Sequence, residues 1–347
     1  MAGDWITFEL TDRCQLTCKH CLRDPGKRPT DLPLPLVRSS LEQAKCFLRS
    51  FHAAFTGGEP VLHPEFSAIL DAAVDLDYTW HMVTNGQRFE RVIDTLLERP
   101  LRKEKLTALT ISLDGADEAT HDAIRSPGSY REVMKAASLC MAHEIPFAFN
   151  TTLHAKNVHQ LESMGLLASQ LGADRISFIL FSATGTKHDA ELYLSARQWR
   201  NVMDRIDRLA EALTIRVNIP EGFHRKQPWH VCAPFTGQQI HVDVHGRVIL
   251  CCQHAGIPRD PNDNRDIVGS LYEMNLAEAC RRFLGIVHRF QEDKMLAMER
   301  GELKDDWDYF PCNYCMKYFG KPYWTSEGAA GPSAIRARRK KRLPVLG

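Results

Sequence analysis

The sequence predicts an α/β fold built on a parallel sheet, and three observations lead to this prediction. Short runs rich in β-branched and aromatic residues alternate six times with amphipathic helical windows from the N-terminus. Polar or glycine-containing segments follow nearly every such run. No apolar run approaches the ~20 residues that span a bilayer. Repeated βα units give parallel strands with right-handed crossovers and outer helices. Six units rather than eight predict an open, partial (β/α)6 barrel.

The individual elements follow from the same runs. We expect strands at 5–10, 53–56, 79–84, 106–113, 146–152 and 174–181, and helices at 36–51, 64–76, 89–98, 130–143, 157–171 and 195–213. After residue 220 the pattern changes to a hairpin at 239–251, with a turn at His245-Gly246, and a helix at 275–290. The expected domains are therefore a barrel at 1–220, a small hairpin-plus-helix domain at 221–325 and a tail at 326–347.

The composition of the chain indicates which partners and which cellular compartment to expect. Its formal net charge of +1 creates no overall field, so we expect neither a membrane nor a nucleic-acid partner. Eleven cysteines, with no room for a signal peptide before the first strand, indicate metal ligation in a reducing compartment and a cytoplasmic protein. Six of the seven residues from 336 to 342 are basic. We expect a solvated, flexible tail there; docking of an acidic peptide or of nucleic acid is the alternative.

Three cysteines follow the first predicted strand. Cys14, Cys18 and Cys21 are separated by three and two residues. Three thiolates in one loop can hold three irons of a [4Fe–4S] cluster and leave the fourth iron open to a small molecule. Zinc fits less well, because it prefers four ligands in two closely spaced pairs, and His20 inside the loop is the only other candidate ligand here.

A Gly57-Gly58-Glu59-Pro60 segment follows the second predicted strand. Two glycines allow the backbone to approach a ligand closely, and a glutamate accepts hydrogen bonds from a cationic amine. The same residues also occur in ordinary turns, so the segment gains meaning only from its place one βα unit after the cysteine loop.

The cysteine spacing resembles the C-x3-C-x-Φ-C loop of the radical S-adenosylmethionine (SAM) superfamily, with His20 at the usually aromatic position Φ. The resemblance implies that Cys14, Cys18 and Cys21 bind the cluster and that His20 stacks on the adenine of SAM. It also implies that Gly57, Gly58 and Glu59 bind the SAM amino group. The segment from Ser112 to Arg125 resembles the fourth-strand region of the subfamily with extra C-terminal clusters. By this resemblance Ser112 and Arg125 hold the SAM carboxylate or ribose, and Asn150 the ribose. A surface salt bridge is the alternative for Arg125. Asp114 faces either the substrate or its own turn.

The later cysteines resemble the SPASM/Twitch extension of this superfamily. Cys232-x13-Gly246-x4-Cys251 brackets the predicted hairpin, Cys312-x2-Cys315 follows, and no cysteine comes after Cys315. The resemblance implies one auxiliary [4Fe–4S] cluster on Cys232, Cys251, Cys312 and Cys315. A four-thiolate zinc site is the alternative. We expect Cys252 to point elsewhere, although it could replace Cys251, and we expect Cys46, Cys140 and Cys280 to be packed or surface thiols.

The resemblance also implies a reaction. The cluster reduces SAM, a 5′-deoxyadenosyl radical takes a substrate hydrogen, and the auxiliary cluster accepts the remaining electron, so that the substrate is oxidised. Redox-neutral epimerisation is the alternative, with Cys252 as a candidate hydrogen donor. The expected electron donor is a flavodoxin or ferredoxin.

Two substrate classes compete. We expect maturation of a ribosomally made peptide, with oxidation of a small molecule such as an aminocyclitol or a cofactor precursor as the alternative. A non-catalytic iron–sulfur or zinc protein is the third possibility. The chain begins at the first strand and is expected to lack the N-terminal winged-helix leader-peptide domain common in peptide maturases. This weakens the peptide interpretation but does not remove it, since such a domain can be a separate protein.

Overall fold

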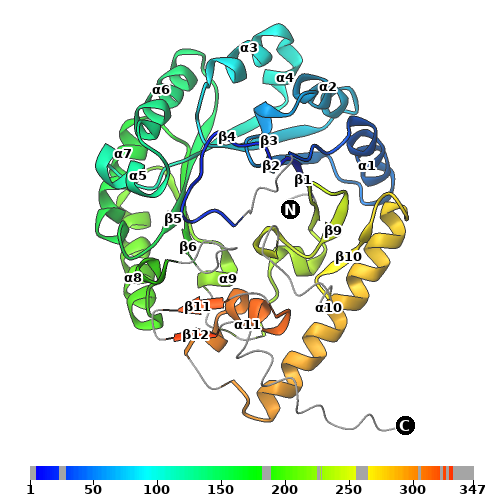
Figure 1. The fold of residues 1–347 in the computed structure, drawn as a ribbon, viewed down its shortest axis with the longest axis vertical. Helices are drawn as coiled ribbons and strands as arrows, with labels where there is room; N and C mark the ends of the chain where they lie inside the picture. The colour runs from blue at the N-terminus through cyan, green and yellow to red at the C-terminus, as the bar shows by residue number, and fades with distance from the viewer. Residues whose placement is uncertain are drawn as a thin grey trace.

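The computed structural model describes residues 5–22, 29–181, 189–224, 227, 229–254, 265–303, 306–320, 323–325 and 328–330. Within these residues one ten-stranded sheet runs in the order β10-β9-β8-β1-β2-β3-β4-β5-β6-β7. Figure 1 shows the sheet curving into an open ring with most helices on its outside. The fold is therefore α/β with a partial barrel, as expected.

Seven parallel strands form the wall of the barrel. They are β1 (Trp5–Thr11), β2 (His52–Gly57), β3 (Thr79–Thr84), β4 (Leu106–Ser112), β5 (Phe147–Leu153), β6 (Arg175–Leu180) and β7 (Arg216–Asn218). The first six lie within one residue of their predicted bounds. The short β7 was not predicted; its three residues alternate as Arg-Val-Asn and are too few to give a periodic signal.

The helices between these strands are α1 (Leu34–Phe47), α2 (Phe66–Asp75), α3 (Glu90–Glu98), α4 (Pro100–Glu104), α5 (Glu118–Ile124), α6 (Ser129–Ala142), α7 (Leu161–Gln170) and α8 (Ala196–Ala212). The predicted end of the first helix at residue 51 is wrong. Arg49 adopts a left-handed conformation, with φ of 52°, and this ends the helical hydrogen-bonding pattern before β2 begins. The short helices α4 and α5 were not predicted.

Side chains alternate between the two faces of the barrel wall. In β1, Ile6, Phe8 and Leu10 are fully buried in the core shared with the outer helices. Thr7 and Glu9 are also buried, but successive residues of a strand point to opposite faces, so they lie on the inner side. The wall is thus apolar towards the helices and carries polar groups inside the barrel.

The C-terminal part extends the same sheet. It contains α9 (Glu221–His224), β8 (Gln239–Val242), β9 (Arg247–Ile249), β10 (Ile267–Ser270), α10 (Leu276–Glu299), α11 (Pro311–Tyr318), β11 (Tyr323–Thr325) and β12 (Gly328–Ala330). Gly246, with φ of 70°, makes the predicted turn between β8 and β9. The hairpin does not form a separate sheet, because β8 pairs in parallel with β1 and takes up the hydrogen bonds of the free barrel edge.

The predicted end of the last long helix at residue 290 is also wrong. Helix α10 runs nine residues further, past the end of its apolar stripe, and stops before Gly301, which has φ of 63°. Strand β12 lies within the segment expected to be a tail, where it pairs with β11. The basic residues 336–342 lie outside the described residues. In the described part of the chain, no helix combines the length and the apolar character needed to cross a membrane.

We predict that Trp80→Phe lowers the free energy of unfolding by about 1–3 kcal/mol. Trp80 is fully buried on β3, and its indole N–H donates to the carbonyl of Arg102 at 2.8 Å. Phenylalanine removes this donor and leaves a small void. Urea unfolding measures the change. Leu97→Ala, at a side chain 54% exposed, is the control and should change stability by less than about 0.5 kcal/mol.

Candidate functional site

The cysteine loop and the strand ends enclose one cavity of about 350 Å³. Cys14, Cys18 and Cys21 line it from the loop that follows β1. Gly57 and Ser112 come from the ends of β2 and β4, Gly58 follows β2, Asn150 comes from the middle of β5, and Arg125 follows α5. His20 lines it as well. All predicted residues of the first site except Glu59 therefore border the same space, because the carboxyl ends of parallel strands meet at one edge of a sheet.

The two glycines hold the cysteine loop close to the barrel. The Gly58 N–H donates to the Thr11 carbonyl at 2.6 Å, and the Glu59 N–H donates to the Arg13 carbonyl at 2.7 Å. A Cβ atom at Gly57 or Gly58 would overlap with this backbone, and Gly57 also has φ of 139°. We expected the glycines to make room for a ligand. The structure shows that the close approach they permit is to the segment leading into Cys14.

Glu59 is fully buried and does not line the cavity. Its Oε1 accepts from the Thr84 hydroxyl at 2.9 Å, and its Oε2 accepts from the Asn85 N–H at 2.8 Å. Burial raises the pKa of this carboxyl to about 7, against the effect of these hydrogen bonds. In this structure Glu59 fixes the end of β3 beside the cysteine loop. The Asn85 side-chain amide in turn lies 3.5 Å from the Cys14 Sγ.

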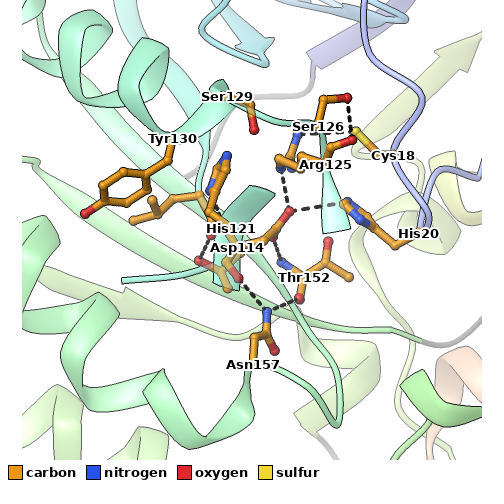
Figure 2. Close-up of polar contacts among 12 residues, drawn as sticks. Cys18, His20, Asp114, His121, Arg125, Ser126, Ser129, Tyr130, Thr152 and Asn157 are labelled. Atoms are coloured by element: carbon orange, nitrogen blue, oxygen red, sulfur yellow. Dashed lines mark hydrogen bonds and ion pairs between the residues drawn. The ribbon is translucent and has the colours of Figure 1, made fainter. Parts of the chain in front are cut away.

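Arg125, which lines the cavity, forms a buried ion pair with Asp114 behind it (Figure 2). The Arg125 Nε donates to the Asp114 Oδ2 at 2.5 Å, and the two side chains are 8% and 0% exposed. The alternative of a surface salt bridge is therefore wrong for Arg125. The other Asp114 oxygen accepts from the Thr152 N–H at 2.8 Å. Of the two roles considered for Asp114, the structure supports the structural one, because the carboxylate is fully enclosed by protein groups.

Arg125 lies between this carboxylate and the cysteine loop. Its Nη1 is 4.0 Å from the Cys18 Sγ. Burial opposes the charge on Arg125, but Asp114 and the nearby thiols outweigh it and raise the pKa of the guanidinium. Burial also raises the pKa of the Cys18 thiol to about 11, against the opposing charge of Arg125. Deprotonation of such a thiol needs a cation that compensates the buried thiolate, as a bound metal centre does.

His20 points towards the same ion pair (Figure 2). Its Nε2 lies 3.5 Å from the Asp114 Oδ2, and its buried Nδ1 has no protein partner among the described residues. Burial lowers the pKa of His20 to about 4, although Asp114 acts in the opposite direction. The side chain is therefore a neutral imidazole beside the cavity, a chemistry that suits stacking on an aromatic base.

The second cysteine set lines a separate cavity. Cys232, Cys251, Cys312 and Cys315 border it, together with Lys294 from α10. Burial raises the pKa of Cys232, Cys312 and Cys315. A hydrogen bond with Cys252 and burial raise that of Cys251. The four side chains come from three segments of the chain, because Cys312 and Cys315 share α11, and the fold brings all four to one cavity.

Cys252 belongs to the first cavity rather than the second. It lines the barrel cavity with Gln253, whereas its neighbour Cys251 lines the second cavity. Cys252 thus faces the first cavity, although its thiol also interacts with that of Cys251, and the expectation that it is not a ligand stays a prediction. The remaining cysteines behave as expected, with Cys46 exposed and Cys140 and Cys280 buried in helices.

Sequence reasoning missed a buried acid–base pair beside the first cavity. Glu9 on β1 lines the cavity, and its Oε1 lies 2.9 Å from the Nε2 of His241 on β8. Both side chains are almost fully buried. A glutamate inside an otherwise apolar strand run was the available signal. Its partner lies 232 positions away, so only the pairing of β1 with β8 reveals it.

Comparison with known proteins agrees with this geometry. Residues 8–167 match the model of the radical SAM superfamily. The mycofactocin maturase MftC of Mycobacterium tuberculosis is 32% identical over 254 residues, which are 72% of this chain and 62% of that protein. This chain thus spans about three fifths of the length of that relative.

Two further curated relatives match most of the chain. The PqqA peptide cyclase of Gluconobacter oxydans is 28% identical over 258 residues, covering 71% of this chain and 69% of that protein. The AdoMet-dependent heme synthase of Methanosarcina barkeri is 23% identical over 248 residues, covering 70% and 68%.

Among solved structures, SuiB of Streptococcus suis bound to S-adenosylmethionine has the same fold. Its TM-score is 0.64 at 14% identity, and the match covers 80% of this chain and 65% of that one. Residues 8–167 are therefore a radical SAM superfamily domain, a domain type that works with a [4Fe–4S] cluster and SAM.

Proposed function

We propose that this chain is a radical SAM enzyme that modifies a ribosomally made peptide by a net oxidation, with one auxiliary [4Fe–4S] cluster. The observation that carries the proposal is the single cavity on which the three-cysteine loop, both glycines, Ser112, Arg125 and Asn150 converge. The proposed domains are the barrel at 1–220, the cluster-binding part at 221–325 and the tail at 326–347.

The residues present fit a SAM-binding cluster. Cys14, Cys18 and Cys21 border one cavity and would supply three thiolates, so that the fourth iron of a bound cluster would be left for SAM. When bound, the cluster supplies one electron to SAM, whose cleavage gives methionine and a 5′-deoxyadenosyl radical that takes hydrogen from the substrate. The chain itself binds, orients and excludes water.

Arg125 is the proposed partner of the SAM carboxylate. Asp114 holds its Nε edge, and among the described residues its other N–H groups have no protein acceptor besides the distant Cys18 sulfur. A guanidinium fixed along one edge can present the rest of its planar fork to a carboxylate. Ser112 and Asn150, paired on the adjacent strands β4 and β5, supply a hydroxyl and an amide for the ribose. We further propose His20 for the adenine, and the Gly57-Gly58-Glu59 segment for the amino group.

The second cavity fits an anionic metal centre. Four cysteines border it, and so does the buried Lys294, for which no carboxylate partner exists among the described residues. A buried ammonium is costly unless negative charge lies nearby. Four thiolates bound to iron supply that charge, and four thiolates bound to zinc would do so as well. We favour iron because an electron acceptor next to the SAM cavity allows the substrate to be oxidised.

The peptide substrate is supported by the curated relatives. One of them is named as a peptide cyclase and another as a maturase. In this proposal the modification is a crosslink or a thioether. A redox-neutral epimerisation, with Cys252 as the candidate hydrogen donor, is the alternative. A flavodoxin or ferredoxin supplies electrons, and a separate protein binds the leader peptide. The relation to a heme synthase supports a small-molecule substrate as the second candidate.

We predict about eight irons per chain in the anaerobically reconstituted protein. Replacing Cys14, Cys18 and Cys21 together by alanine should leave about four irons and abolish the change that SAM causes in the electron paramagnetic resonance (EPR) spectrum. Replacing Cys232, Cys251, Cys312 and Cys315 should also leave about four irons but retain the response to SAM. Cys46→Ala is the matched control and should keep all the iron. About four irons with one zinc in the wild type would contradict the auxiliary cluster.

We predict that Arg125→Lys weakens SAM binding at least tenfold, which corresponds to about 1.4 kcal/mol. Lysine keeps the charge but loses the planar fork and cannot pair with Asp114 and the SAM carboxylate in the same geometry. Equilibrium dialysis of reconstituted protein measures the dissociation constant. Arg131→Lys changes a 77% exposed arginine paired with Glu118 and should leave binding unchanged. Equal dissociation constants for the wild type and Arg125→Lys would remove Arg125 from the site.

The substrate class is tested by binding and turnover. We expect the protein to bind a short precursor peptide encoded beside its gene, and mass spectrometry to show that peptide two hydrogens lighter after incubation with SAM and reductant. A scrambled peptide is the control. Turnover of an aminocyclitol or a porphyrin precursor, with no binding to any such peptide, would instead support the small-molecule function.

A further inference from the structure

Lys294 is a buried cation beside the second cavity, and the proposed function gives it no role in the reaction. It lies on α10, is 1% exposed, and borders the second cavity with Cys232, Cys312 and Cys315. Its Nζ lies 5.8 Å from the ring centre of Phe290 and 5.3 Å from that of Tyr314. The ammonium is thus held between aromatic rings, away from water and beside the cysteines.

The other basic side chains around this cavity have carboxylate partners. The His254 Nδ1 lies 3.1 Å from the Asp266 Oδ2, and the His230 Nε2 lies 2.9 Å from the Glu221 Oε2. Among the described residues, Lys294 has no such partner. Burial lowers the pKa of Lys294, and the negative charge of Cys315, Cys232 and Cys312 opposes this effect. The cysteines of the second cavity are therefore the negative groups that balance the buried Lys294 ammonium.

A positive charge in this position favours the reduced form of a cluster. Reduction by one electron adds negative charge to a centre that is already anionic, and a nearby ammonium stabilises the more negative form more strongly. The surrounding rings and buried thiols keep the local dielectric constant low, so the interaction is only weakly screened. Net charge near an iron–sulfur cluster is one of the properties that set its reduction potential.

We propose that Lys294 is a positioning residue that raises the reduction potential of the auxiliary cluster, so that this cluster accepts the electron of the substrate radical. The proposal rests on the proposed function, in which Cys232, Cys251, Cys312 and Cys315 hold iron and sulfide. One hydrogen atom of the substrate goes to the 5′-deoxyadenosyl radical and forms 5′-deoxyadenosine. The substrate radical then loses one electron to the cluster and one proton to water. The product has two hydrogens fewer, and a carrier of the flavodoxin or ferredoxin class takes the electron from the cluster.

The test is a redox titration of the auxiliary cluster, monitored by EPR. The full chain with Cys14, Cys18 and Cys21 replaced by alanine isolates this cluster from the first one. In this background Lys294→Met removes the charge at similar length, Lys294→Gln does so with a polar group, and Lys294→Arg retains it. Arg289→Met removes an exposed charge from the same helix and is the matched control.

We expect lower midpoint potentials for Lys294→Met and Lys294→Gln, and potentials close to that of the parent protein for Lys294→Arg and Arg289→Met. Loss of iron in both neutral variants, with iron kept in Lys294→Arg, also supports a required charge. An unchanged potential in either neutral variant, or loss of iron in all three Lys294 variants, overturns the inference. A parent protein without iron in this centre refutes the proposed function instead.

Discussion

The cavity beside the cysteine loop depends on one buried carboxylate. Asp114 follows β4 and is fully buried, and its two oxygens bind the Arg125 guanidinium and the Thr152 N–H (Figure 2). It thereby ties the end of β5 and the segment after α5 to the end of β4. Removing one partner of such a pair costs about 3–5 kcal/mol, because the other charge remains buried and uncompensated. The Asp114–Arg125 ion pair is therefore required first for the stability of the structure. It also fixes the orientation of Arg125 towards Cys18.

The sequence predicted the barrel well because its periodic signals are strong. Six strands fall within one residue of their expected bounds, since each is a short apolar run between polar turns. The sequence did not reveal that the Glu59 carboxylate also binds the Thr84 hydroxyl and the Asn85 N–H at the end of β3. The motif correctly predicted that Glu59 lies near the cysteine loop. Which atoms Glu59 contacts depends on how closely the Gly58 backbone approaches Thr11. Such tertiary approaches have no local signal.

The sequence did not reveal which residues far apart along the chain are neighbours in the fold. The parallel pairing of β1 with β8 joins the C-terminal hairpin to the barrel edge and brings Glu9 next to His241. The same pairing places two adjacent cysteines on different cavities, Cys252 on the first and Cys251 on the second. Lys294 lies four residues after the buried Phe290, on the same buried face of α10, so its burial agrees with the helical period. What the sequence does not show is that Tyr314 of α11 and the second cavity lie beside it.

The central claim is that the open cluster position and the strand ends together form a SAM-cleaving site. The most direct measurement is the amount of 5′-deoxyadenosine released when the anaerobically reconstituted full chain is incubated with dithionite and SAM in the absence of substrate. We expect release in the wild type and none in a Cys18→Ala variant. A wild-type protein that holds iron and binds SAM but releases no 5′-deoxyadenosine would contradict the account.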